Sequence, residues 1–379
     1  MTASATIVTP TGTAAPAGSV QFQIDGDNFG PAEPVSSSGA SFTGQILKGP
    51  NGLTVPGTNT LKATFTPADP THYSASTPGS AGFTLSQEDA RAYYTGALLA
   101  STGSINNTTA NVTLAATIKD ITAVTGDPAS DQYPGDIRNA IVTFVNRDAS
   151  GAVLCSAPIG LVSLSDSTVG TATCTSTPLL ANTTAGGSQY TIGIVVSGYY
   201  TRNLQTDDQV INVYIPQSNF ITGGGYLNNT SSAGQYPGAI GQRTNFGFNV
   251  KYNKSGTNLQ GNINVIVRNN GRVYQIKGNS MTSLATLVCT ANPCPTTTSA
   301  STATFNGKAS IQDITDPLNP ISIDGGATLQ VTMTDFGSPT SDKIGITVWN
   351  KSGGLWFASN WDGTRTVEQT LAGGNLSVH

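Results

Sequence analysis

Hydrophobic and polar residues alternate along most of this chain of 379 residues. A period of two is typical of strands, because successive side chains of a strand point to opposite faces of the sheet. The alternation, or a run of β-branched residues, occurs at 20–24, 61–65, 112–118, 140–145, 246–252, 263–267 and 344–349, with Gly, Pro and Asn between the stretches. The one helix-like stretch, 86–92, is too short for more than a turn. The pattern therefore predicts an all-β protein built from sandwiches or barrels.

Two breaks in the pattern divide the chain. An alternating strand ends at 83–85, and 87–89 opens a new unit. The strand at 210–215 ends at Pro216, and 221–226 begins a third unit. We therefore expect three β-domains, at 1–87, 88–216 and 217–379, each large enough to bury its own core. The linkers are short, so neighbouring domains should touch and form a stiff rod.

A faint internal repeat links the second and third units. Residues 116–122 and 309–315 share one pattern, and each is followed by a loop that contains proline. The similarity is explained either by two hairpins with the same turn chemistry or by a duplicated structural unit.

Several stretches resemble known bacterial families. Residues 16–22, 57–65 and 69–76 resemble the bacterial immunoglobulin-like repeat (group 3 type) of large surface proteins. Residues 221–226, 244–252 and 272–277 look like the post-COAP type of C-terminal module found in large secreted bacterial proteins, and the middle segment resembles an immunoglobulin-like spacer. The resemblance implies tandem immunoglobulin-like β-sandwiches followed by a C-terminal β-sandwich or jelly-roll-like domain. It also implies a structural or adhesive role, and it brings no catalytic residues.

The composition argues against an enzyme. Charged residues make up 10% of the chain, whereas soluble proteins usually contain about 25%. There are two histidines: His72 lies in a turn signal, and His379 is terminal. No motif of a hydrolase elbow, phosphate loop, zinc protease or dinucleotide site is present. Two carboxylates can suffice for glycoside hydrolysis, but the acids of the third segment mostly stand in turn contexts: Asp313, Asp316, Asp324, Asp335, Asp342, Asp362 and Glu368.

Charge and hydropathy limit the partners. The net charges of segments 1–88, 89–216 and 217–379 are −3, −4 and +3, and the basic surplus of the last is too dispersed for a nucleic-acid site. No run approaches the ~20 apolar residues that a membrane span needs. The start of the chain lacks a secretion signal, so we expect a fragment of a longer exported protein, located outside the cell or on its surface.

The four cysteines form two local pairs. Cys155 and Cys174 could form a cross-strand bridge, and Cys289 and Cys294 could staple a turn. A zinc site is the weaker alternative, because the usual spacing and histidine ligands are missing. Free thiols are the other alternative.

Acidic residues in the loops of the second segment could bind calcium, which prefers oxygen ligands. The best candidate ligands are Glu88, Asp89, Asp120, Asp127 and Asp136. The competing explanation is that aspartate favours turns for its own hydrogen-bonding reasons. Calcium is the one cofactor that the sequence suggests.

Three tryptophans, Trp349, Trp356 and Trp361, lie close together near the end of the chain. Aromatic faces stack on sugar rings, so Trp356, Trp361 and Asn360 could bind a glycan, whereas Trp349 ends an alternating strand and should be buried. The sequence thus favours a non-catalytic structural or adhesive segment that acts as a stalk or assembly module, with a carbohydrate-binding module as the alternative. The expected partners are neighbouring domains or copies of the same protein, and a surface polysaccharide.

Overall fold

The computed structural model confirms the all-β class. It describes residues 1–9, 11, 13–44, 56–130, 133–181, 187–216, 220–289, 300–338 and 340–379. Within these residues the only helical elements are four 3₁₀ turns, η1 (Ile121–Ala123), η2 (Ile137–Asn139), η3 (Arg147–Ala149) and η4 (Gln205–Asp207). No helix in the described part of the chain is long and apolar enough to cross a membrane. The chain divides into two compact units, Met1–Glu88 and Asp89–His379.

The first unit is a small sandwich, here called the N-terminal sandwich. Its strands are β1 (Thr2–Thr6), β2 (Gly18–Ile24), β3 (Asp27–Asn28), β4 (Glu33–Pro34), β5 (Gly39–Thr43), β6 (Gly57–Pro67) and β7 (Gly79–Leu85). One sheet pairs β1 with β5, and the other has the order β3-β2-β6-β7 with β4 beside β2. Alternate residues of β2, namely Val20, Phe22 and Ile24, fill the core between the sheets.

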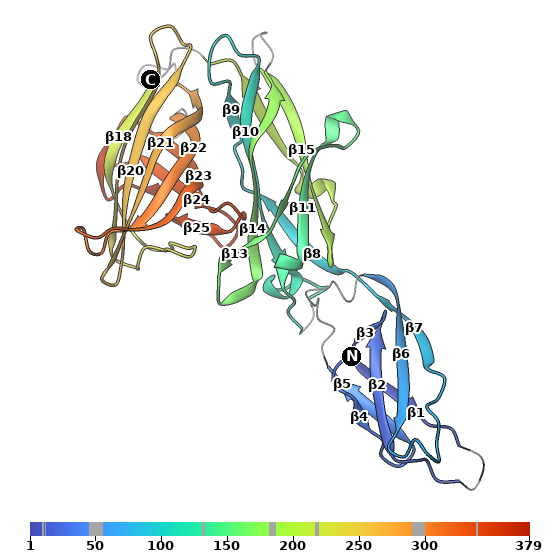
Figure 1. The fold of residues 1–379 in the computed structure, drawn as a ribbon. Coiled ribbons are helices and arrows are strands. Elements are labelled where there is room, and N and C mark those ends of the chain that lie inside the picture. The colour runs from blue at the N-terminus through green and yellow to red at the C-terminus, as the bar shows by residue number, and fades with distance from the viewer. Residues whose placement is uncertain are drawn as a thin grey trace. The chain divides into compact units, whose positions relative to one another are not determined.

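The second unit begins with another sandwich, here called the middle sandwich (Figure 1). Its strands are β8 (Glu88–Tyr94), β9 (Leu99–Ser101), β10 (Thr109–Asp120), β11 (Ala140–Asn146), β12 (Ala152–Pro158), β13 (Gly160–Ser163), β14 (Asp166–Leu180), β15 (Ser188–Gly198), β16 (Tyr200–Thr201) and β17 (Gln209–Tyr214). One sheet has the order β13-β14-β10-β8-β16, and the other has the order β12-β11-β15-β17-β9. In chain order these strands match A, B, E and D in the first sheet and C′, C, F and G in the second, which is the immunoglobulin arrangement.

A disulfide joins the two sheets of the middle sandwich. Cys155 on β12 is bonded to Cys174 on β14, with the two Cα atoms 6.5 Å apart. This confirms the predicted bridge, which contributes roughly 3 kcal/mol in the chain-entropy account. The other predicted pair, Cys289 with Cys294, remains a prediction because Cys294 lies outside the described residues.

The rest of the second unit is one long antiparallel sheet, here called the curled sheet. Its strands are β18 (Phe220–Asn228), β19 (Arg243–Tyr252), β20 (Leu259–Asn269), β21 (Arg272–Leu287), β22 (Ser301–Asp313), β23 (Ile321–Asp335), β24 (Lys343–Trp349), β25 (Leu355–Ala358), β26 (Gln369–Thr370) and β27 (Gly373–Val378). They are ordered β25-β24-β23-β22-β21-β20-β19-β18-β27, so most neighbours in the chain are neighbours in the sheet. The sheet curls around a single core of alternating residues, such as Phe248, Val265 and Phe305.

Contacts beyond the strand ladder close the curl on both edges. At the β25 edge, Ala233 from the loop after β18 forms a bridge with Ala358. At the β27 edge, the backbone N–H of Leu376 donates to Oδ2 of Asp342, and that of Val378 donates to Oδ2 of Asp335, both at 3.0 Å. The carboxylates therefore satisfy the strand edge that has no partner strand.

Aspartate carboxylates also hold many of the turns. At least ten of them accept a hydrogen bond from the backbone N–H two residues further along: Asp69, Asp120, Asp127, Asp136, Asp166, Asp313, Asp316, Asp324, Asp335 and Asp362. The internal repeat follows this rule, because Asp120 and Asp313 both end a strand and bind the N–H of a threonine, Thr122 and Thr315. The two segments therefore share their turn chemistry, and a duplicated structural unit stays the alternative explanation.

The closure at β27 predicts a large effect for one side chain. Asp342 is fully buried and also accepts from the backbone N–H of Phe336 at 3.0 Å. Replacing it by alanine leaves buried N–H groups without an acceptor, so Asp342→Ala should lower the free energy of unfolding by about 2–4 kcal/mol. Urea denaturation measures this loss. The exposed Asp316, which supports only its own loop, is the control: Asp316→Ala should cost less than about 1 kcal/mol, and equal losses would contradict the closure.

Candidate functional site

The middle sandwich and the curled sheet meet in a contact that we call the junction. At one end, the hydroxyl of Ser101 on β9 donates to the carbonyl of Leu284 on β21 at 2.7 Å and lies 2.8 Å from the hydroxyl of Tyr252 on β19. The Tyr252 hydroxyl donates to the carbonyl of Thr102 at 3.0 Å, and the N–H of Ser101 donates to the hydroxyl of Ser283 at 3.0 Å. Burial raises the pKa of Tyr252 to about 12, so its hydroxyl remains a donor at neutral pH.

Apolar packing continues the junction. Trp349, Leu355 and Ala358 of the curled sheet form one buried cluster with Ala115 and Val162 of the middle sandwich. Trp349, which the sequence predicted to be buried, is 1% exposed. It therefore belongs to the junction as well as to its own strand.

Backbones approach closely beside this cluster. The hydroxyl of Thr171 on β14 donates to the carbonyl of Gly353. A Cβ atom added to Gly160 would overlap the backbone of Gly354, so the two glycines permit a contact that larger residues would prevent.

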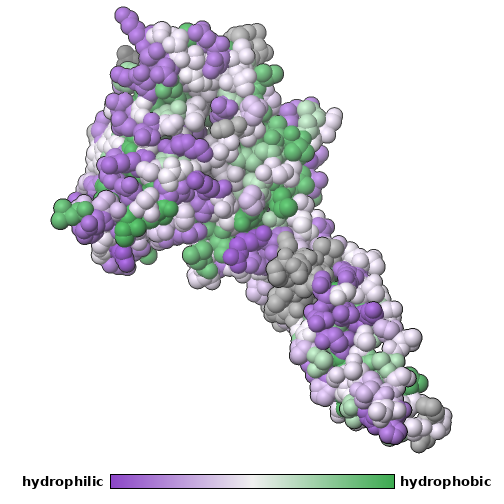
Figure 2. Space-filling model, in the orientation of Figure 1, coloured by the Kyte–Doolittle hydropathy of each residue, from purple (hydrophilic) through white to green (hydrophobic). Residues whose placement is uncertain are grey.

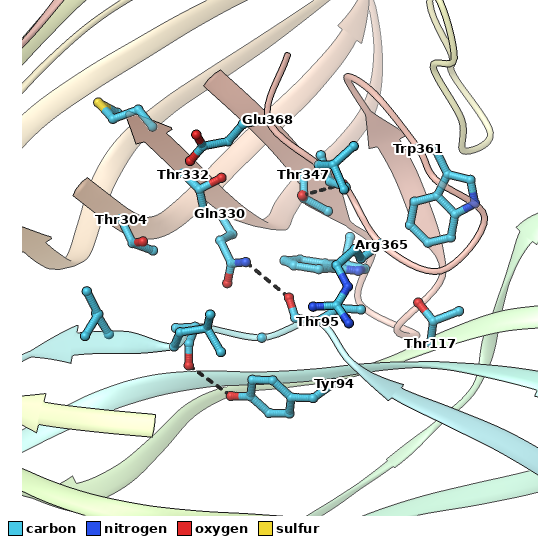
Figure 3. Close-up of a pocket in the computed structure, with 18 of the residues that line it drawn as sticks. Tyr94, Thr95, Thr117, Thr304, Gln330, Thr332, Thr347, Trp361, Arg365 and Glu368 are labelled. Carbon is cyan, nitrogen blue, oxygen red and sulfur yellow. Dashed lines mark hydrogen bonds between the residues drawn. The ribbon is translucent and has the colours of Figure 1, made fainter. Parts of the chain in front are cut away.

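A cavity of about 350 Å³ remains within the junction (Figure 3). Eight threonines line it, together with Gln330, Trp361, Arg365 and Glu368. Its volume falls near the lower end of the range for small-molecule sites, about 300–1,000 Å³. Figure 3 shows Glu368, Thr332 and Gln330 on one side and Trp361 beside Arg365 on the other.

Two hydroxyls in the cavity lining are buried without a hydrogen-bond partner within the described part of the chain. They belong to Thr95 and to Thr117, and Thr117 is 0% exposed. Gln330 of the curled sheet reaches across the cavity to the middle sandwich, where its Nε2 donates to the carbonyl of Thr95 at 3.2 Å. Buried polar groups normally have partners, so these two hydroxyls are available to hydrogen-bond a small hydroxylated molecule in the cavity.

Glu368 is the one carboxylate in this lining as the structure describes it. Burial raises the pKa of its carboxyl, while a hydrogen bond from the hydroxyl of Thr334, at 2.6 Å to Oε2, opposes the rise. Glu368 is one of the acids of the third segment for which the sequence predicts no site. Its position became apparent only from the fold, because no local motif surrounds it.

The predicted glycan-binding residues do not form one site. Trp361 lines the cavity, whereas the indole of Trp356 donates to Oδ2 of Asp324 at 2.8 Å and packs against Tyr236 with ring centroids 5.1 Å apart. Asn360 does not line the cavity; its side-chain oxygen accepts from the hydroxyl of Thr230. Only Trp361 therefore belongs to the cavity.

The predicted calcium ligands are engaged with protein donors. Asp89 and Asp127 both lie near Arg91, at 4.0 and 2.6 Å, and Asp136 binds Arg138 at 2.6 Å. The Arg138 hydrogen bond holds the pKa of Asp136 below its ordinary value.

Asp120 is the most enclosed of the predicted ligands. It is fully buried and accepts from the N–H of Gly135 at 2.9 Å and the hydroxyl of Tyr200 at 2.8 Å, besides Thr122. Burial alone would raise its pKa, but these hydrogen bonds hold the pKa below the ordinary value. Glu88 is the first residue of β8. The described residues contain no group of three or more metal-ligating side chains, and calcium binding remains a prediction.

No family model matches this chain, and neither a curated protein nor a solved structure is similar to it. The resemblances to bacterial immunoglobulin-like and post-COAP-type modules thus stay predictions.

The raised pKa of Glu368 makes stability depend on pH. A carboxyl whose pKa is higher in the folded state is destabilising once it ionises, so its favourable contribution is present in acid and lost as the pH rises through the folded pKa. Glu368→Gln, which cannot ionise, should therefore raise the melting temperature at pH 7 and leave it unchanged below pH 4. Thermal melts across this range measure the difference. The control is Asp362→Asn: the pKa of the exposed Asp362 carboxyl is lowered, so this variant should decrease the melting temperature at pH 7. A Glu368→Gln variant with a lower melting temperature than the unmodified chain at pH 7 would contradict the burial argument.

Proposed function

We propose that this chain is a non-catalytic structural or adhesive segment of a secreted or cell-surface bacterial protein. Within it, the middle sandwich and the curled sheet act as one stiff element of a stalk or assembly. The resemblance of the first and third segments to modules of large exported proteins supports this proposal.

The observation that carries the proposal is the burial of β10 on both faces. Ala110, Val112, Leu114, Ala116 and Ile118 point into the sandwich core. The residues between them, Thr113, Ala115 and Thr117, are at most 4% exposed although they point away from that core. Through Ala115, which packs in one cluster with Trp349 and Leu355, β10 links the middle sandwich to the curled sheet, and such coupling resists bending and independent unfolding.

The use of charge supports the same proposal. Most aspartates bind backbone N–H groups in turns or pair with arginine, as with Asp208 and Arg147 at 3.0 Å. Arg202 similarly pairs with Asp207 on the loop that carries η4. Charged side chains that bind backbone N–H groups or each other in this way stabilise loops instead of forming a reactive cluster.

Mechanical unfolding tests the proposed stiff element. Stretching the full chain from its two ends should unfold Asp89–His379 in one event that releases roughly 90 nm while the disulfide is closed. Trp349→Ala removes a side chain shared by the two parts and should lower the unfolding force and split the event in two, at a cost of about 3–5 kcal/mol.

Phe144→Leu, inside the middle sandwich, is the matched control and should weaken the same single event without splitting it. Two events in the unmodified chain would refute the stiff element.

Carbohydrate binding in the junction cavity is the second candidate function. The unpartnered hydroxyls of Thr95 and Thr117, beside the ring of Trp361, favour a small neutral hydroxylated ligand such as a single pyranose ring. Aromatic faces and polar side chains together are what such a ligand needs.

A glycan array with neutral monosaccharides and disaccharides tests this candidate. Trp361→Ala and Gln330→Leu should each reduce binding at least roughly ten-fold, the effect of losing one good contact. Trp356→Phe, outside the cavity, should leave binding intact. Binding that survives both cavity variants would eliminate the candidate.

A further inference from the structure

The sequence between Asp208 and Asp313 contains no acidic residue. It contains seven basic residues: Arg243, Lys251, Lys254, Arg268, Arg272, Lys277 and Lys308. They are dispersed in the sequence, because their spacing along the chain is wide. The fold brings several of them onto one surface.

Strand alternation places four of these cations on the outer face of β19, β20 and β21. On β19, Phe246, Phe248 and Val250 are buried in the core, so Arg243 and Lys251 point outward. On β20 and β21 the same alternation turns Arg268 and Lys277 outward. In the described part of the chain no carboxylate lies within 4.0 Å of these four side chains.

The strand register places these charges in three rows that run across the strands. Arg268 contacts the Arg243 carbonyl at 3.1 Å, so these two arginines share a row. Lys277 lies opposite Asn264, and Asn264 lies opposite Gly247. Gly247 stands midway between Arg243 and Lys251 on β19, four residues from each. Four strand residues span roughly 13 Å, so successive rows are separated by about that distance along the strands.

Amide side chains fill the space between the charges. The outward positions beside them include Asn245, Asn249, Asn262, Asn264 and Gln275. Some are ordered by neighbours: Nε2 of Gln275 donates to Oδ1 of Asn264 at 2.9 Å, and Nη1 of Arg268 donates to Oδ1 of Asn245 at 2.6 Å. Amides donate to and accept from hydroxyl groups, so this face can bind a polyhydroxylated partner.

A groove runs along this face. It has a volume of about 610 Å³ and is lined by Gly225, Tyr226, Asn245, Gly247, Asn264 and Gly373, among others. The ring of Tyr226 lies against Gly373, where an added Cβ would come within 2.6 Å of it. The guanidinium of Arg243 lies 4.3 Å from the ring centroid. The groove lining thus combines an aromatic ring with amides, and one cation, Arg243, lies over that ring.

We infer that the outer face of β18–β21 binds an acidic polysaccharide, a chain of sugar rings that carries carboxylates at intervals. Charge complementarity comes from the four cations, hydroxyl recognition from the amides, and contact with a sugar ring from Tyr226. Figure 2 shows mostly hydrophilic residues over β20 and β21, which does not suit insertion into a lipid surface. A nucleic acid carries a charge about every 1.7 Å and needs a denser set of cations.

This inference deepens the adhesive part of the proposed function and rests on it. The experiments distinguish failure of the inference from failure of the proposed function, because loss of polysaccharide binding would not change the single unfolding event expected for Asp89–His379.

Binding of the full chain to immobilised polygalacturonate, a polymer of carboxylated sugars, tests the inference. Dextran, which is neutral, should not bind, and added salt should weaken binding to polygalacturonate. The double variant Lys251→Gln/Lys277→Gln should weaken binding roughly five-fold, within the range of two exposed ion pairs. Lys62→Gln, on the N-terminal sandwich, changes charge elsewhere and should have little effect.

A glycine variant tests the groove without a change of charge. A Cβ on Gly247 would meet no atom within 4 Å, so Gly247→Val should fold normally and obstruct the groove. Gly325→Val, at an equally open glycine of the same sheet, is the control and should bind like the unmodified chain.

Three results would overturn the inference: equal binding to dextran, tighter binding to duplex DNA or to vesicles of anionic lipid than to polygalacturonate, and unchanged binding of both the lysine and the Gly247 variants. Thermal melts of every variant establish that the fold is intact.

Discussion

The structure of the second unit depends on β10, a strand that is buried on both faces. Leu114 and Ile118 of β10 lie in the core of the middle sandwich. On the other face of the strand, Ala115 packs with Trp349 of the curled sheet, and Thr117 lines the junction cavity. A second buried face requires small or weakly polar side chains, because a charged residue there would lose its hydration without a partner. Alanine and threonine satisfy this requirement. Where the two backbones meet, even smaller residues are needed, and Gly160 and Gly354 lie there. The same small side chains do not fill the space between the two parts, and the cavity remains there. The contact between the two parts and the candidate binding site therefore both result from the small residues at the junction.

The scarcity of charge has a second structural consequence. With few carboxylates available, the chain uses most of them to satisfy backbone N–H groups at turns and at one open strand edge. The same scarcity leaves the outer face of β19–β21 with cations that have no carboxylate within 4.0 Å in the described part of the chain, which is the basis of the inferred polysaccharide surface.

Local chemistry made part of this structure predictable from the sequence. Period-two alternation predicted the all-β class, and close spacing predicted the bridge between Cys155 and Cys174. Burial of Trp349 followed from its place at the end of an alternating strand. Each of these depends on neighbours within a strand or a short loop.

Long-range geometry made the rest inaccessible. The outward threonines of β10 look solvated in sequence, and only a partner sheet reveals that they are buried. Glu368, Gln330 and Thr95 come from distant segments, so no spacing could have grouped them. Trp356 and Trp361 are five residues apart but belong to different environments, since one binds Asp324 and the other lines the cavity.

The central claim is that the two parts of the second unit are one cooperative structure, and native-state hydrogen exchange measures this most directly. The free energy of opening should be the same for the amides of β10 and for those of β22 and β23, and should fall with the same denaturant dependence. A middle sandwich whose amides exchange through a separate opening, at clearly lower free energy than those of the curled sheet, would contradict the account.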